Sequence, residues 1–209
     1  MKKPLPTIGV DKYTFFKLVS DTAEGVSYAK PVSLAGTVQI SPTDAGGADT
    51  FDADNGAYEI ETYTEKIGHE LESADIPPEV DALWRGLETV NGAVVVGKPT
   101  GTVYFGVAWR ILKSDGTYRY AKYFKGSYSF ASNLGAKTRP SAGAAEKQTA
   151  KATFTAVQRD YDDLTYMYVD GSDLEIGASA TYKSIDEFEK AWFTDMAVLL
   201  GDTKIVTAE

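Results

Sequence analysis

The chain has no cysteine, and its 209 residues include only one histidine, His69. Without thiols there can be no disulfide, no thiolate metal site and no cysteine nucleophile. Zinc takes about three or four ligands, chiefly Cys and His, so a carboxylate-heavy set around one imidazole suits it poorly. The pair His69-Glu70 begins like the protease motif H-E-x-x-H, but Ser73 stands where the second imidazole belongs. We therefore expect His69 to be a partly buried structural histidine.

Long apolar runs and an excess of cations are also missing. No run approaches the roughly 18 apolar residues of a membrane-spanning helix. Polar sequence follows Met1-Lys2-Lys3-Pro4, where a signal peptide would have its apolar core. The formal net charge of -9 repels nucleic-acid phosphates. These features predict a chain without a membrane partner that does not read DNA sequence.

The usual catalytic motifs are absent or incomplete. There is no G-x-S-x-G elbow to pair with His69. The segment from Gly92 to Lys98 fits a phosphate-binding loop, but Pro99 replaces the hydroxyl residue and the next residues favour a strand. Carboxylates spaced by two along a strand mark a solvated face more often than a glycosidase pair. We predict no enzyme activity and no cofactor.

The residues that are abundant favour β-structure. Tyrosine (13) and phenylalanine (9) are prominent, and alternating apolar positions predict strands over 11–21, 29–40, 102–112, 118–130, 150–157 and 164–169. Helices are predicted after Asp75-Ile76-Pro77-Pro78 and after the capping box Ser184–Glu187, with Gly201 ending the second. The expected fold is one domain over residues 1–209, mainly β with two helices, as an antiparallel two-sheet sandwich or open barrel flanked by a helix.

Two segments rich in turn-forming residues predict long loops at 41–56 and 132–148. Their charges are opposite. The first carries acids and the second carries cations: Asp44, Asp49, Asp52 and Asp54 against Lys137, Arg139 and Lys147. Such a pair suits a heterologous contact between copies of one chain, and it equally suits two solvated loops.

A third pattern is the run of glutamates around His69, namely Glu59, Glu61, Glu65, Glu70 and Glu72. Because side chains alternate along a strand, the last two would face away from the first three if the strand were regular. A one-residue bulge at Gly68 would put all five on one face and turn His69 and Leu71 inward. A turn at Gly68 between two separate strands is the equal alternative.

Whole segments of the chain resemble a known family. They are IGVDKYTFFKL, PVSLAGTVQISPT, NGAYEIETYTEKIGHELESADIPPEVDALW and VYFGVAWRILKSDGTYRYAKYFKGSYSF. Together they are similar to the major tail proteins, or tail tube proteins, of long non-contractile-tailed bacteriophages of Gram-positive bacteria, from about residue 8 to about residue 195. The likeness rests on these segments and not on a short diagnostic motif.

The resemblance implies a virion protein without catalytic residues or cofactor, assembled in the host cytoplasm into stacked hexameric rings that form the tail tube. Its partners would be copies of itself, the tape measure and terminator proteins, and tail assembly chaperones, with DNA passing non-specifically. Some relatives carry a C-terminal immunoglobulin-like domain, which this sequence is not expected to include. The segment 41–56 would be an arm toward a neighbouring ring, with 132–148 as a second arm. All or some of the five glutamates would line the lumen. The alternative is a monomeric β-sandwich module that binds carbohydrate on Tyr118, Tyr120 and Tyr128.

Overall fold

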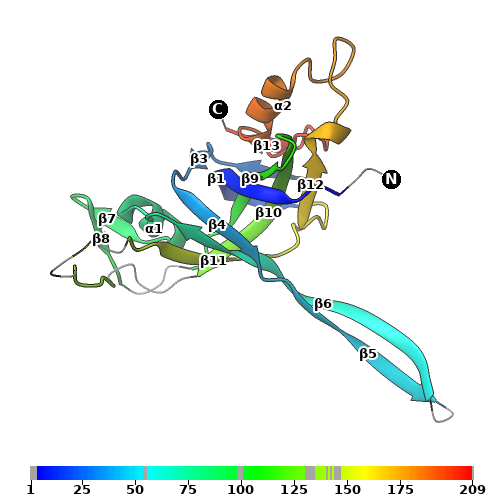
Figure 1. Ribbon diagram of the computed structural model, residues 1–209, viewed down its shortest axis with the longest axis horizontal. Coiled ribbons are helices and arrows are strands. Elements are labelled where there is room, and N and C mark those ends of the chain that lie inside the picture. Colours follow the sequence, from blue (N-terminus) through cyan, green and yellow to red (C-terminus); the bar gives the residue numbers. More distant parts are fainter. Residues whose placement is uncertain are drawn as a thin grey trace.

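The structure, a computed structural model, describes residues 4–53, 56–97, 101–129, 135–139, 141, 143 and 147–208. Within these ranges the protein is mainly β with two α-helices, as expected (Figure 1). Most strands belong to one mixed sheet of eleven strands that is not closed, where the sequence suggested two packed sheets or an open barrel. The strands of this sheet are β1 (Thr7–Thr22), β2 (Gly25–Tyr28), β3 (Val32–Ser33), β4 (Thr37–Pro42), β5 (Ala45–Ala53), β6 (Gly56–Ser73), β9 (Phe105–Lys113), β10 (Tyr118–Ser129), β11 (Ala150–Ala156), β12 (Tyr166–Asp170) and β13 (Ile205–Thr207).

The main path through the sheet runs β13-β2-β1-β9-β10-β11-β6-β4. Strands β3, β12 and β5 branch from it, pairing with β1, β10 and β6 respectively. Among the described strands, the β13–β2 pair is parallel and the other ladders are antiparallel. A separate small hairpin joins β7 (Glu88–Val90) to β8 (Ala93–Val95). A turn at Asp115-Gly116, a dipeptide typical of hairpins, connects β9 to β10, with Gly116 at φ 84°.

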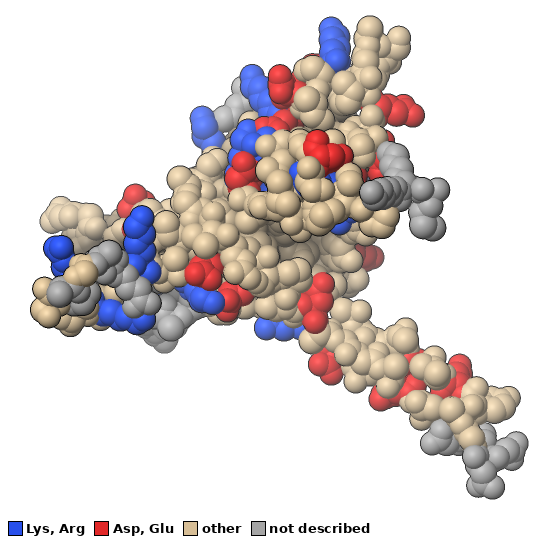
Figure 2. Space-filling model, in the orientation of Figure 1, with Lys and Arg blue, Asp and Glu red and all other residues tan. Residues whose placement is uncertain are grey.

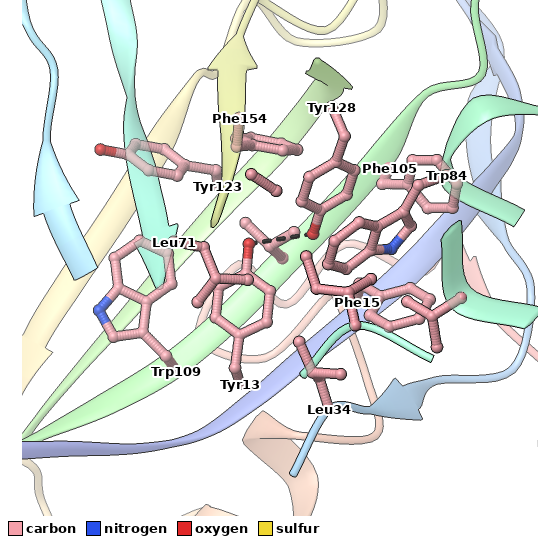
Figure 3. Packing of buried hydrophobic residues seen from close by; sticks show 14 of the residues in the cluster. Tyr13, Phe15, Leu34, Leu71, Trp84, Phe105, Trp109, Tyr123, Tyr128 and Phe154 are labelled. Carbon is pink, nitrogen blue, oxygen red and sulfur yellow. Dashed lines mark hydrogen bonds between the residues drawn. The ribbon is translucent and has the colours of Figure 1, made fainter. Parts of the chain in front are cut away.

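Alternating residues of the central strands build two cores on opposite faces of the sheet. On β1, Tyr13 and Phe15 belong to one core and Phe16 to the other. The helix α1 (Pro78–Arg85) covers the first core, where its Trp84 stacks on Tyr128 with ring centroids 3.8 Å apart (Figure 3). The helix α2 (Ile185–Trp192) covers the second core. The sheet therefore carries one helix on each face.

Both helices begin with the residues that the sequence predicted for their first turns. Pro78 occupies the first turn of α1, and Gly86 ends the helix in the left-handed conformation at φ 64°. Ser184 Oγ accepts a hydrogen bond from the Glu187 backbone N–H at 3.2 Å, which caps α2. The predicted stop at Gly201 is wrong, because α2 ends at Trp192 and turns follow it.

The strand β10 departs from the predicted alternation. Its register against β9 shifts between Tyr123 and Gly126, so a bulge interrupts the alternation of side chains. Tyr120 and Phe124 therefore lie in the core under α2, whereas Tyr128 lies in the core under α1. The alternation expected for a regular strand over 118–130 would place Tyr118, Tyr120, Phe124, Tyr128 and Phe130 on one side, and this expectation is wrong. Phe130 lies outside the described residues.

The segment 29–40, expected as one strand, is divided in two. β3 ends at Ser33, β4 begins at Thr37, and Gly36 between them has φ 87°. This left-handed conformation, which favours glycine, breaks the strand completely. A tighter constraint acts at Gly68, where an added Cβ would lie 2.1 Å from the Phe154 carbonyl oxygen.

Candidate assembly surface

The most prominent feature outside the body is a two-stranded arm formed by β5 and the outer half of β6 (Figure 1). We call residues 45–53 and 56–66 the arm. The sequence predicted a long loop at 41–56, and this is wrong, because Ser41 and Pro42 end β4 and Ala45–Ala53 form β5. Asp54 lies outside the described residues. Glycine and alanine at the start of β5 disfavour a strand, so the sequence did not indicate it. Its partner is β6, which the sequence left open as one bulged strand or two strands.

Hydrogen bonds to Gly68 hold the base of the arm. The Gly68 backbone N–H donates to Asp44 Oδ1 at 3.1 Å, and the Thr43 backbone N–H donates to the Gly68 carbonyl at 3.0 Å. Asp44, predicted to lie in an inter-subunit loop, therefore helps to fix the link between β4 and β5. These contacts tie the arm to the sheet where it leaves the body.

The question of a bulge or a turn at Gly68 has a third answer. β6 is one continuous strand, and its ladder with β11 passes Gly68 without a register shift, with Thr155 opposite. The bulge lies in the arm itself, at its base. Ala45 pairs with Lys66 and Gly46 with Thr64, so Glu65 is the extra residue. Because side chains alternate along a strand, one extra residue reverses which of them face inward beyond the bulge. His69 and Leu71 therefore point inward, and both are fully buried.

The five glutamates fall into two groups. Glu59, Glu61 and Glu65 are exposed on the arm, and the structure records no ion pair between them and any other described residue. Glu70 and Glu72 lie on the body, where Lys151 Nζ of β11 is 2.8 Å and 3.6 Å from their carboxylate oxygens. The pKa of Glu72 is lowered chiefly by a hydrogen bond that Thr149 Oγ1 donates to it, and to a smaller extent by the charge of Lys151. The five acids are therefore not one uniform ladder.

The arm also exposes apolar side chains. Phe51, Tyr58 and Ile60 are 64%, 74% and 64% exposed, and the rings of Phe51 and Tyr58 meet edge to face at 6.5 Å. Asp49 is exposed on the same hairpin. In Figure 2 the outer arm shows carboxylates among uncharged atoms. A two-stranded ribbon with both faces in water is at best marginally stable.

The cationic segment lies apart from the arm. Lys137, Arg139 and Lys147 are exposed, and the described parts of 132–148 contain no helix or strand, as expected. The Gln148 side chain accepts from the Lys137 backbone N–H at 3.0 Å, which joins the two sides of this segment. Figure 1 shows residues 135–139 at the end of the molecule opposite the arm. The two oppositely charged segments thus lie too far apart to neutralise each other within one copy.

His69 is a core residue whose ring is packed among aromatic side chains. Its Nε2 is 2.8 Å from the Tyr13 hydroxyl. The Tyr13 hydroxyl is in turn 2.9 Å from the Tyr128 hydroxyl, and Figure 3 marks this second hydrogen bond. The Tyr123 and Phe154 rings stack on the imidazole. Burial lowers the pKa of His69 to about 3, so the ring is neutral. The structural histidine predicted from the sequence is confirmed, with deeper burial than expected.

The aromatic platform suggested for carbohydrate is not where the sequence placed it. Tyr120 and Tyr128 are buried and Tyr118 is half-buried, because these rings pack in the two cores. Instead, Tyr166 and Tyr168 of β12 are 47% and 62% exposed. In the sequence, these two tyrosines stand two residues apart on a predicted strand, and this spacing could have indicated that their rings lie on the same face.

Comparisons with known proteins add no identification: neither a family model nor a curated protein matches this sequence. Among the described residues, no helix is long and apolar enough to cross a membrane. The same part of the chain contains no cluster of three or more potential metal-binding His, Asp or Glu residues.

Proposed function

We propose that this protein is a structural subunit of a bacteriophage tail tube, which self-assembles into stacked hexameric rings and forms the conduit for DNA ejection. The projecting arm is the observation that carries the proposal. It exposes Phe51, Tyr58 and Ile60 on a ribbon that has no sheet or helix covering either face within the described chain. Contiguous exposed apolar groups mark interaction surfaces. Docking on a neighbouring copy would cover them and stabilise the hairpin.

The separation of charge supports assembly between identical copies. An acidic arm at one end and the exposed cations Lys137, Arg139 and Lys147 at the other allow a heterologous arrangement, in which different surfaces of successive copies meet. Heterologous contacts close into rings or propagate as filaments, depending on the rotation between copies. We include in this proposal that the open sheet is arranged as in tail tube proteins.

Lining of the lumen by carboxylates is a further part of the proposal. Within a Debye length of about 8 Å, fixed carboxylates repel DNA phosphates and so keep DNA from adhering to the wall. The two groups of glutamates call for separate variants in phage particles, one with Glu59, Glu61 and Glu65 changed to lysine and one with Glu70 and Glu72 changed to lysine. The variant in which the lumen-lining group is changed to lysine should form intact tubes but show impaired DNA ejection. Normal infectivity of both variants would remove the lumen role.

Negative-stain electron microscopy of the concentrated protein tests the proposed function. The expected result is rings or tubes with a central channel. The rival function is a monomeric carbohydrate-binding module, favoured only by the exposed pair Tyr166 and Tyr168. A strictly monodisperse monomer that binds a glycan would decide for that rival.

A further inference from the structure

Exposed aromatic side chains occur in two groups on the described surface. One group is on the arm, where Phe51 and Tyr58 are the most exposed rings. The other is on β12, where Tyr166 and Tyr168 lie side by side. In the part of the chain whose exposure is described, Tyr104 is the one exposed ring outside both groups.

The β12 group borders a groove. We call the hollow of about 180 Å³ between β9, β10 and β12 the β12 groove. Its walls include Tyr166 and Tyr168, whose rings are nearly parallel with centroids 6.3 Å apart. Trp109 and Tyr123 also line it, and Figure 3 shows these two rings at one end of the core under α1. The volume is below the roughly 300–1,000 Å³ of a cofactor site, so it suits one or two inserted side chains.

The charge beside the groove is positive. The Arg119 guanidinium lies 5.6 Å from the Tyr168 ring and is oriented by Asp170, which accepts from its Nε at 2.6 Å and from its Nη2 at 3.2 Å. Lys113 contacts the same carboxylate. Two cations thus share one acid. The arm presents the opposite charge next to its rings, with Asp49, Glu59 and Glu61.

We propose that the β12 groove receives the arm of a second copy of this chain, with the Phe51 and Tyr58 rings seated against Tyr166 and Tyr168. Within one copy the arm leads away from β12, so the contact must be intermolecular (Figure 1). Aromatic pairs prefer offset or edge-to-face packing, which adjacent exposed rings allow. Carboxylates on the arm would meet Arg119 at the rim. This inference rests on the proposed self-assembly and names the surface that the arm contacts.

Cysteine cross-linking tests the contact directly, because the natural chain has no thiol that could compete. Tyr58→Cys and Tyr168→Cys are prepared separately, mixed with each other and oxidised. The expected product is a disulfide-linked pair of chains at a yield well above that of Tyr58→Cys mixed with Tyr104→Cys. Equal yields from the two mixtures would overturn the assignment of the groove.

A mixing experiment tests the heterologous geometry. Tyr58→Ala and Tyr168→Ala should each weaken association on the order of 30-fold, as truncation of a central aromatic anchor does. A mixture of the two retains one intact arm and one intact groove per pair, so it should yield dimers that do not grow. Tyr104→Ala is the matched control and should assemble normally. Near-ultraviolet circular dichroism checks that each variant is folded.

The outcomes separate this inference from the proposed function. If wild-type protein assembles and Tyr168→Ala assembles equally well, the groove is not the docking site, although the tube proposal stands. If wild-type protein does not assemble at any concentration, the proposed function is overturned, and the inference that rests on it is overturned as well. Glycan binding that depends on Tyr168, without self-association, would assign the groove to a saccharide and overturn the inference.

Discussion

The neutral imidazole of His69 makes the stability of this protein depend on pH. Burial lowers the pKa of His69 to about 3, against about 6.5 in the unfolded chain. Between these values the unfolded state binds a proton that the folded state does not, so stability rises with pH in this window and falls as the solution is acidified below about pH 6.5. The loss should reach roughly 2 kcal/mol at pH 5 from this residue alone.

The variant His69→Gln removes this titration and keeps a polar group that can hydrogen-bond with the Tyr13 hydroxyl in either direction. Urea unfolding at pH 7 and pH 5 should show a smaller loss of stability for His69→Gln than for the wild-type protein. Carboxylates titrate in both proteins, so they cancel in the comparison. An identical pH dependence would mean that His69 is charged or exposed in the folded protein.

Gly68 has a steric role that the sequence could only hint at. Any Cβ would lie 2.1 Å from the Phe154 carbonyl oxygen, so β6 and β11 can pair this closely only at glycine. We expect Gly68→Ala to lower the free energy of unfolding by about 2 kcal/mol, as overpacking does. Gly97→Ala, where no atom lies within 4 Å of the added Cβ, is the control. Equal stabilities in denaturant unfolding would contradict the close approach.

At the scale of elements, strongly periodic segments were predictable and weakly periodic ones were not. The apolar alternation of β9 and the capping box of α2 gave the correct structure, because burial on one face leaves a clear pattern. β5 escaped prediction, since glycine, alanine and aspartate disfavour strands and its stability comes from pairing with β6. The bulge in β10 also escaped, because nothing in a single sequence marks a change of register there.

The arm should be the least protected strand pair in the free monomer. It has no core on either face in the described structure, and local stability follows buried contacts. Hydrogen exchange of the monomer should therefore show fast exchange of the β5 amides and slow exchange of the β9 and β10 amides. On assembly the β5 amides should become protected. Persistent fast exchange of β5 in assembled protein would show that the arm remains free.

At the scale of the whole molecule, charge and shape both favour association with further copies. The net charge of -9 opposes random aggregation, while the arm places its acids away from the exposed cations at the opposite end. Ordering of mobile groups on docking costs roughly 1 kcal/mol or more per residue, which contacts repeated around a ring would offset. The charge pattern and the resemblance in the sequence suggested this assembly. The sequence could not show that the acidic segment is one strand of a two-stranded ribbon.

Sedimentation velocity over a range of protein concentrations tests the role of the arm most directly. Wild-type protein should form discrete assemblies larger than a monomer as concentration rises. A variant with Phe51, Tyr58 and Ile60 changed to serine should remain monomeric and folded, because these exposed side chains support no core. Assembly of that variant at wild-type concentrations would contradict the account.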